Sequence, residues 1–304
     1  MVLVPMFANL GTAMMNQLVT LFIFILLAQS WNVIGGYTGQ INLGIAAFFG
    51  CSVMVTHFLW VAGFPIIAAI AIGSISTIIF AIFIGIPTLR LRGMYFAVGT
   101  LALTQALQVI VQNVFNRAIN SPGSYVKSFN IDSRYYLGLV LVVIVMAALY
   151  LISRSRLGLA FVAIRDDEQA AQVTGINILK YKVIALLISA FIAGLAGGLY
   201  AYFNLYFYYS ANIFGHNWTF DGVMAVIIGG AGTLFGPLLG SIFLVALGYV
   251  FSLTLGQANL IVFGFLFILV VLFLPQGLMG GIDMFRPWLA RMRRRSGRKA
   301  ADTT

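Results

Sequence analysis

Long apolar runs separated by short polar or glycine-rich stretches dominate this chain. Runs such as 18–34, 66–86, 137–152 and 260–274 are long enough for helices that cross a hydrocarbon core of ~30 Å. The alternation of apolar and polar residues that would indicate transmembrane strands is absent. The pattern therefore predicts an all-α, polytopic transmembrane helical bundle of roughly 8–10 spans, some of them broken.

The positions of the individual spans follow from the same pattern. We expect them at residues 14–35, 40–60, 64–87, 93–115, 135–153, 182–207, 219–230, 235–255 and 259–275. The 219–230 segment is short. The pattern leaves open whether this segment crosses the bilayer or re-enters from one side.

Glycine interrupts the apolar pattern at two places. The first interruption is GGYTGQINLG at residues 35–44, and the second is GGAGTLFGPLLG at residues 229–240. Backbone groups freed at membrane depth must face protein or a water-filled cavity, and paired interruptions in two halves of a chain are typical of transporters built from inverted repeats. Close packing of helices through small residues is the alternative. The candidate pathway residues here are Gly39, Gln40, Asn42, Gly44, Gly229, Gly230 and Gly232.

One internal loop, residues 154–182, carries eight of the 24 charged residues of the chain. Asp166 followed by Gln169 fits a capping box, and Gly175 supplies a left-handed stop, so we expect a short helix at residues 167–174. A helix this short is marginal in water and needs a surface to rest on. We interpret the loop as a docking element for a cytoplasmic protein; a solvated loop lying against the membrane is the alternative. The docking residues are Arg165, Asp166, Asp167, Glu168, Ala170, Ala171 and Gly175.

The net charge of +10 comes mainly from short loops and from a basic tail after the last apolar run. This distribution is typical of topology control by cytoplasmic positive charge and argues against nucleic-acid binding. We therefore expect Arg90, Arg92, the 154–182 loop and the C-terminus on the cytoplasmic side. We expect the chain to divide into a transmembrane domain, 1–285, and a basic cytoplasmic tail, 286–304, that contacts anionic lipid.

Ionisable and nucleophilic groups are scarce in the predicted spans. The sequence has no Walker-type loop with lysine and Ser/Thr, so we do not expect it to bind ATP, and it shows no nucleophile–base set typical of an enzyme. A proton- or sodium-driven carrier normally keeps ionisable groups inside the membrane, so we expect the energy to come from outside this chain. Gln105 and Gln108 share one helix face and either line the pathway or hydrogen-bond between helices. The rival hypotheses are a channel or secondary carrier and, less favoured, a membrane-embedded enzyme.

Five motifs carry a resemblance to the branched-chain amino acid ABC transporter permeases, the membrane subunits of the hydrophobic amino acid uptake family. The most specific is the loop block SRLGLAFVAIRDDEQAAQVTGINILKYKVIALLISAFIAGLAGGLYA. The others are GGYTGQINLGIAAFFG, LRLRGMYFAVGTLAL, MAVIIGGAGTLFGPLLGSIF and LPQGLMGG. The similarity runs from about Trp31 to Gly281, and the loop favours the second of the two permease types in such systems.

The resemblance implies an ABC importer permease that carries branched-chain or hydrophobic amino acids across the bacterial inner membrane. It implies a heterodimer with a second, related permease, two cytoplasmic ATP-binding subunits that hold ATP and magnesium, and an extracytoplasmic solute-binding protein. No cofactor or metal is expected in this chain. Residues Asp166 to Gly175 would be the coupling helix on an ATPase. Ile45 stands where the family often has histidine, and an outer glycine-rich loop is reduced to 120–123, so urea, short amides or other amino acids are alternative cargoes.

Overall fold

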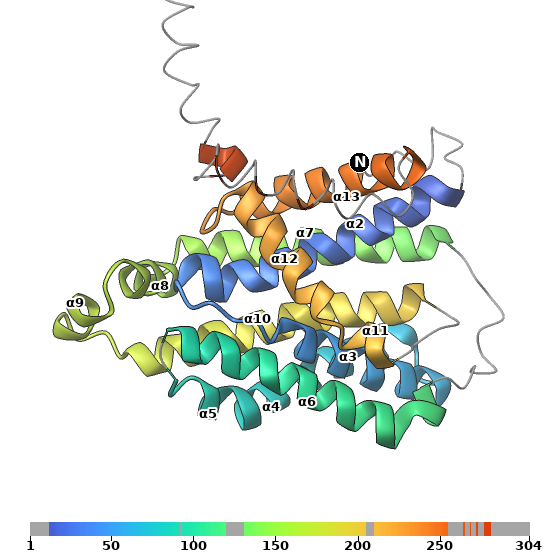
Figure 1. The fold of residues 1–304 in the computed structure, drawn as a ribbon, viewed down its shortest axis with the longest axis horizontal. Coiled ribbons are helices and arrows are strands. Elements are labelled where there is room, and N and C mark those ends of the chain that lie inside the picture. Colours follow the sequence, from blue (N-terminus) through green and yellow to red (C-terminus); the bar gives the residue numbers. More distant parts are fainter. Residues whose placement is uncertain are drawn as a thin grey trace, which may run out of the picture.

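The computed structural model describes residues 12–91, 93–119, 131–204, 210–254, 264, 268, 272 and 277–280. These residues form an elongated bundle of helices with no strand among them (Figure 1). Five helical segments are long and apolar enough to cross a membrane, and two further apolar helices are shorter. The predicted all-α polytopic bundle is confirmed. Most of the predicted 259–275 span and the whole basic tail lie outside the described residues.

The order of elements follows the predicted spans closely. The first half contains α2 (Thr12–Trp31), η1 (Asn32–Tyr37), α3 (Ile45–Val61), α4 (Ile66–Phe80), η2 (Ala81–Gly85), α5 (Ile86–Thr88) and α6 (Met94–Ile119). The second half contains α7 (Ile131–Ser153), α8 (Arg156–Asp166), α9 (Glu168–Val173), α10 (Ile178–Phe203), α11 (Ser210–Ile213), α12 (His216–Gly229) and α13 (Gly236–Thr254). The two η elements are π-helical turns that extend α2 and α4.

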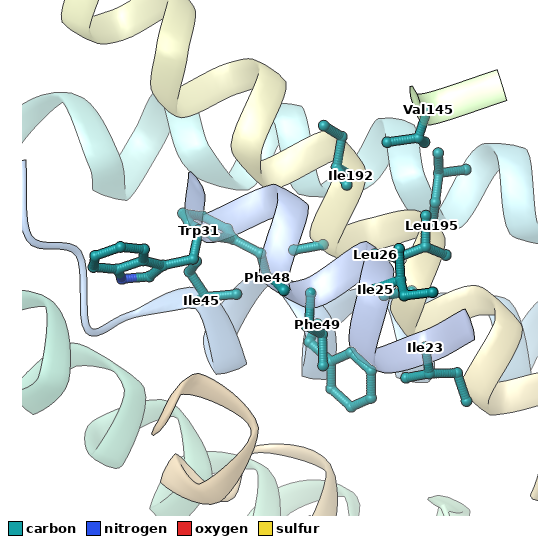
Figure 2. Close-up of a cluster of buried hydrophobic side chains, with 14 of the residues drawn as sticks. Ile23, Ile25, Leu26, Trp31, Ile45, Phe48, Phe49, Val145, Ile192 and Leu195 are labelled. Carbon is teal, nitrogen blue, oxygen red and sulfur yellow. The ribbon is translucent and has the colours of Figure 1, made fainter. Parts of the chain in front are cut away.

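Two helices form the centre of the bundle. About three quarters of the apolar stretch is buried in α2 (78%) and α10 (72%), against 28% in both α6 and α7. Figure 2 shows the resulting core, in which side chains of α2 and α10 meet those of α3 and α7. Among them are Leu26, Phe49, Val145 and Leu195, all buried. The outer helices therefore expose most of their surface to whatever surrounds this chain.

Small residues let α10 approach α3 and α4 backbone to backbone. A Cβ atom on Gly194 would lie 2.8 Å from the Cα of Ser74, and one on Gly197 would overlap the carbonyl of Phe49. Hydroxyl groups also cross these contacts, because Ser52 Oγ donates to the Gly194 carbonyl at 2.6 Å. Thr77 Oγ1 donates to a further α10 carbonyl at 2.8 Å. This is the packing mode of helices that associate in lipid through small residues and side-chain hydroxyls.

An irregular connection and a short helix interrupt the series of full spans. The chain leaves η1 as an irregular segment, residues 38–44, in which Gly39 has a φ of +71°, before α3 begins (Figure 1). Helix α12 has 14 residues, about 21 Å at 1.5 Å per residue, which is less than the ~30 Å hydrocarbon core. The 219–230 segment is therefore a partial span.

Helices α8 and α9 lie at one end of the bundle, where α9 projects beyond the other helices (Figure 1). We name this the α9 end. The turn that follows α5 lies at the same end, because Leu89 and Arg90 line a groove shared with α9.

Candidate functional site

The charged loop contains two helices in place of the one that the sequence predicts. Helix α8 (Arg156–Asp166) continues through Asp166, and a single extended residue, Asp167, separates it from α9 (Glu168–Val173). The Oδ1 atom of Asp167 accepts hydrogen bonds from the backbone N–H groups of Gln169 at 2.8 Å and Ala170 at 3.1 Å. Asp167 is therefore the N-cap of α9.

The predicted capping box at Asp166 and Gln169 is wrong by one residue. Asp166 still has helical partners in α8, so it cannot take the extended conformation that an N-cap requires. Gln169 contributes its backbone N–H, not its side chain. The predicted stop is confirmed: Gly175 has a φ of +88°, where a side chain would be strained.

The faces of α9 also differ from the prediction at one residue. Ala171, assigned to docking, is only 4% exposed and packs toward its own chain. Val173 is 89% exposed, and Gln169 and Ala170 are exposed as well. The outward surface of α9 is therefore formed by Gln169, Ala170 and Val173, which we call the α9 surface.

An ion pair ties α9 to the start of α10. Lys182 Nζ lies 2.5 Å from Glu168 Oε1, and the lysine side chain is only 12% exposed. Beside this pair lies a groove of about 600 Å³ that separates α9 from the end of α5. Arg90, Glu168, Gln172 and Lys182 are among its lining residues. Glu168, predicted as a docking residue, thus holds the position of α9.

The two glycine-rich interruptions lie against each other, although about 200 residues separate them. We call residues 32–44 the first break and residues 229–236 the second break. The buried side chain of Asn32 joins them: its Oδ1 accepts from the Gly232 N–H at 2.8 Å, and its Nδ2 donates to the Thr233 carbonyl at 2.9 Å. One amide therefore satisfies a donor and an acceptor of the opposite break.

Arg165 reaches this junction from the last turn of α8. Its Nη1 donates to the carbonyl of Gly36 at 2.8 Å. A Cβ atom on Gly232 would overlap the same guanidinium, and one on Gly39 would lie 3.3 Å from Arg165 Cγ. The structure thus brings together Arg165 of the docking set with Gly39 and Gly232 of the pathway set.

The other pathway candidates have distinct surroundings. In the first break, Asn42 and Gly44 lie directly before α3. Side-chain oxygens accept hydrogen bonds from three backbone N–H groups here. Thr100 binds that of residue 43 at 3.1 Å, Asn42 that of residue 44 at 2.8 Å, and Thr219 that of residue 46 at 3.0 Å. The N–H of Gln40 is bound by the carbonyl of residue 34 at 3.0 Å. These bonds anchor the first break to α6 and α12.

In the second break, Gly229 and Gly230 pack against backbone. A Cβ atom on Gly229 would overlap the carbonyl of Gly236, and Gly277 approaches Gly230 in the same way. At these two positions the contacts favour close packing, the alternative that the sequence left open.

The remaining candidates, Gln105 and Gln108, lie on α6. Gln105 is exposed, and its Nε2 lies 3.3 Å from His216 Nδ1 of α12. Gln108 is half-buried, and its Oε1 has no hydrogen-bond partner among the described residues. The outward faces of α4 and mid-α7 carry only apolar or aromatic side chains. The outward face of α6 is the one that carries amides, including Asn113.

Sequence reasoning missed the α2 side chains that hold the junction. Gln29 Nε2 donates to the carbonyl of Leu234 at 2.8 Å, one turn before Asn32. Both amides are fully buried. The signal was available: two amides three residues apart in an apolar run, directly before the first glycine pair, need buried partners.

Comparison with known proteins decides the family. The family model described as "Branched-chain amino acid transport system / permease component" matches residues 13–272. The chain belongs to this family. It is therefore a multi-pass membrane transport permease, in agreement with its apolar helices.

Several relatives within this family of permeases are similar over much of the chain. The high-affinity branched-chain amino acid transport system permease protein LivM of Escherichia coli is 26% identical over 321 residues, which cover 94% of this chain and 73% of the relative. The protein of the same name from Salmonella typhimurium is 25% identical, with 88% and 69% covered. A probable LivM permease of Methanocaldococcus jannaschii is 28% identical over 59% of this chain and 53% of its own length. No solved structure matches significantly.

Proposed function

We propose that this chain is the permease subunit of an ABC importer for branched-chain amino acids, with α9 as the helix that docks on a partner ATPase. The observation that carries the proposal is the position of α9. It is a six-residue helix that stands outside the bundle with Val173 almost fully exposed. A helix this short does not persist in water without support, and an exposed valine at its end suits a hydrophobic pocket on another protein.

The contacts around α9 support a docking role because they fix its direction. The Asp167 cap, the ion pair from Glu168 to Lys182 and the turn at Gly175 hold the helix at both ends. The α9 surface is then presented without a large loss of conformational entropy on binding. In this proposal two partner ATPase subunits bind ATP and magnesium, and this chain supplies neither a nucleotide site nor a cofactor.

The α9 end faces the cytoplasm of a bacterium, and the chain lies in the inner membrane. Arg90, Arg165, Lys180 and Lys182 all lie near the α9 end, which fits the preference of basic residues for the cytoplasmic side. The basic tail is assigned to the same side. A solute-binding protein then delivers the amino acid to the opposite end.

The pathway runs between this chain and a second, related permease, along the outward face of α6. Amide side chains that face hydrocarbon are costly, whereas amides that face a water-filled path or a protein are not. The exposed Gln105 and the half-buried Gln108 distinguish α6 from α4 and the middle of α7, whose outward faces are apolar or aromatic. Uncharged amides suit a zwitterionic cargo that brings its own two charges.

Reconstitution tests the proposal. The chain is co-expressed with its partner permease and ATP-binding subunits, placed in proteoliposomes and supplied with the solute-binding protein. We expect ATP-dependent uptake of labelled leucine that isoleucine and valine compete away and urea or acetamide does not. Uptake of leucine without the ATP-binding subunits would contradict the proposal, as would uptake of urea in place of leucine.

A graded series at Val173 tests the docking helix separately. We expect Val173→Thr, which keeps the shape, to weaken binding of the ATP-binding subunit only slightly. Val173→Asp places a charge in the apolar contact and should lower co-purification of that subunit and leucine uptake at least tenfold, because burying an unpaired charge is costly. Equal co-purification of both variants would remove α9 from the interface.

A further inference from the structure

We infer that Arg165 is a positioning residue that connects the docking helix to the two breaks and holds them together at the α9 end of the pathway. The inference rests on the proposed function, because it assigns a route by which an ATPase bound to α9 acts on the membrane part. Arg165 itself then faces the permease and not the ATPase.

The contacts of the guanidinium place it at the edge of the junction, with part of the Arg165 side chain exposed. It bonds the carbonyl of Gly36 in η1 at 2.8 Å and lies against Gly232 of the second break. Arg165 is thus the point where three segments meet: α8, the first break and the second break. Glycine at 39 and 232 leaves the room that the side chain occupies, because a Cβ atom at either position would crowd Arg165.

The acceptor of Arg165 is a neutral carbonyl, although Asp166 and Asp167 follow it directly in sequence. Among the described residues the ion pair of this region is that of Lys182 with Glu168, and Arg165 takes no part in it. A single hydrogen bond to a carbonyl is weaker than a bidentate arginine–carboxylate pair. The contact is therefore strong enough to bias an equilibrium between two arrangements and weak enough to be released.

The path from α9 to this contact is short. Arg165 lies in the last turn of α8, and only Asp167 stands between α8 and α9. One turn before Arg165, on the same side of the helix, Phe161 is buried, and the neighbouring Ile164 is buried as well, so this side of α8 is anchored to the bundle. A displacement of α9 consequently acts on the end of α8 that carries Arg165. When the guanidinium leaves Gly36, the breaks lose a side chain of α8 that contacts both of them.

Two substitutions of similar length separate hydrogen bonding from packing. Arg165→Met fills much of the same space without a donor, and Arg165→Lys keeps one donor and the charge. In the complete reconstituted transporter we expect Arg165→Met to retain its ATP-binding subunits and nucleotide hydrolysis. Leucine uptake per ATP hydrolysed should fall about tenfold, the change that corresponds to loss of one hydrogen bond to a charged donor. Arg165→Lys should retain part of the leucine uptake per ATP hydrolysed that Arg165→Met loses.

The control is Arg156→Met, which removes the same side chain from the exposed first turn of α8. It should leave uptake per ATP unchanged. Wild-type coupling in Arg165→Met overturns the inference. Loss of the ATP-binding subunits from Arg165→Met also overturns it, because Arg165 would then belong to the docking surface. If wild-type protein itself shows no ATP-dependent uptake, the proposed function fails and not the role of Arg165 alone.

Discussion

The two breaks solve the same physical problem in different ways. Both leave backbone polar groups without a regular helical ladder inside a membrane protein, where unsatisfied groups cost several kcal/mol. At the first break and the start of α3, side chains satisfy these groups: Thr100, Asn42 and Thr219 accept from the backbone N–H groups of residues 43, 44 and 46. The second break has few side chains of its own. Asn32 and Gln29 bind its backbone groups from outside, and at Gly229 its backbone packs directly on the backbone of Gly236.

From this difference we expect the stability of the protein to respond differently to substitutions in the two breaks. A side-chain hydrogen bond is lost one at a time, so the first break should weaken in steps. Backbone packed on backbone cannot relax around an added methyl group, so the second break should fail abruptly. Three substitutions, taken from the largest expected effect to the smallest, test this contrast.

The largest effect is expected from Gly229→Ala. The new methyl group would overlap the Gly236 carbonyl, and no flexible side chain is there to move away. We expect the free energy of unfolding to fall by about 3 kcal/mol, the upper range for overpacking. The measurement is loss of monodisperse protein on heating in detergent. Gly248→Ala in α13 is the matched control, since nothing lies within 4 Å of its added Cβ; it should be neutral or stabilising.

A smaller loss is expected from Asn32→Ala, which cuts the link between the breaks. The Gly232 N–H and the Thr233 carbonyl lose their buried partner together. We expect a loss of about 2 kcal/mol in the free energy of unfolding. Asn113→Ala serves as the control, because Asn113 is exposed and its Nδ2 donates to a carbonyl of its own helix. Equal melting of the two variants would show that Asn32 does not hold the junction.

The smallest effect is expected from Thr100→Val, a near-isosteric change on α6. It removes the oxygen that accepts from the N–H of residue 43 at 3.1 Å. One hydrogen bond of three at the start of α3 is lost, so we expect a decrease of about 1 kcal/mol. The same change at Thr20, whose hydroxyl bonds a carbonyl of its own helix, is the comparison. If Thr100→Val lowered the free energy of unfolding as much as Gly229→Ala, the first break would not weaken in steps.

The sequence predicted the spans well because their signal is local. In a membrane protein an apolar run of about 20 residues predicts a transmembrane helix. The observed helices α2 with η1, α6, α7 and α10 all lie within a few residues of the expected positions. The two breaks were also visible, since glycine and proline interrupt such runs without regard to tertiary contacts.

What the sequence could not give are the contacts between distant segments. The register of the α9 cap depended on where α8 ends, and α8 itself was predicted as loop because its buried face is formed by small and apolar residues in a charged stretch. The contact of Arg165 with Gly36 depends on the packing of segments 129 residues apart. The hydrophobic periodicity of one segment does not show which distant segment packs against it.

The backbone contacts of α10 with α3 and α4 have a consequence for how the molecule moves. Where main chain touches main chain at Gly194 and Gly197, there is no layer of rotatable side chains through which these helices can slide. The three helices are expected to travel as one rigid body during a transport cycle. Relative motion then concentrates where the bundle is joined by individual hydrogen bonds, between this unit and the pair α12–α13.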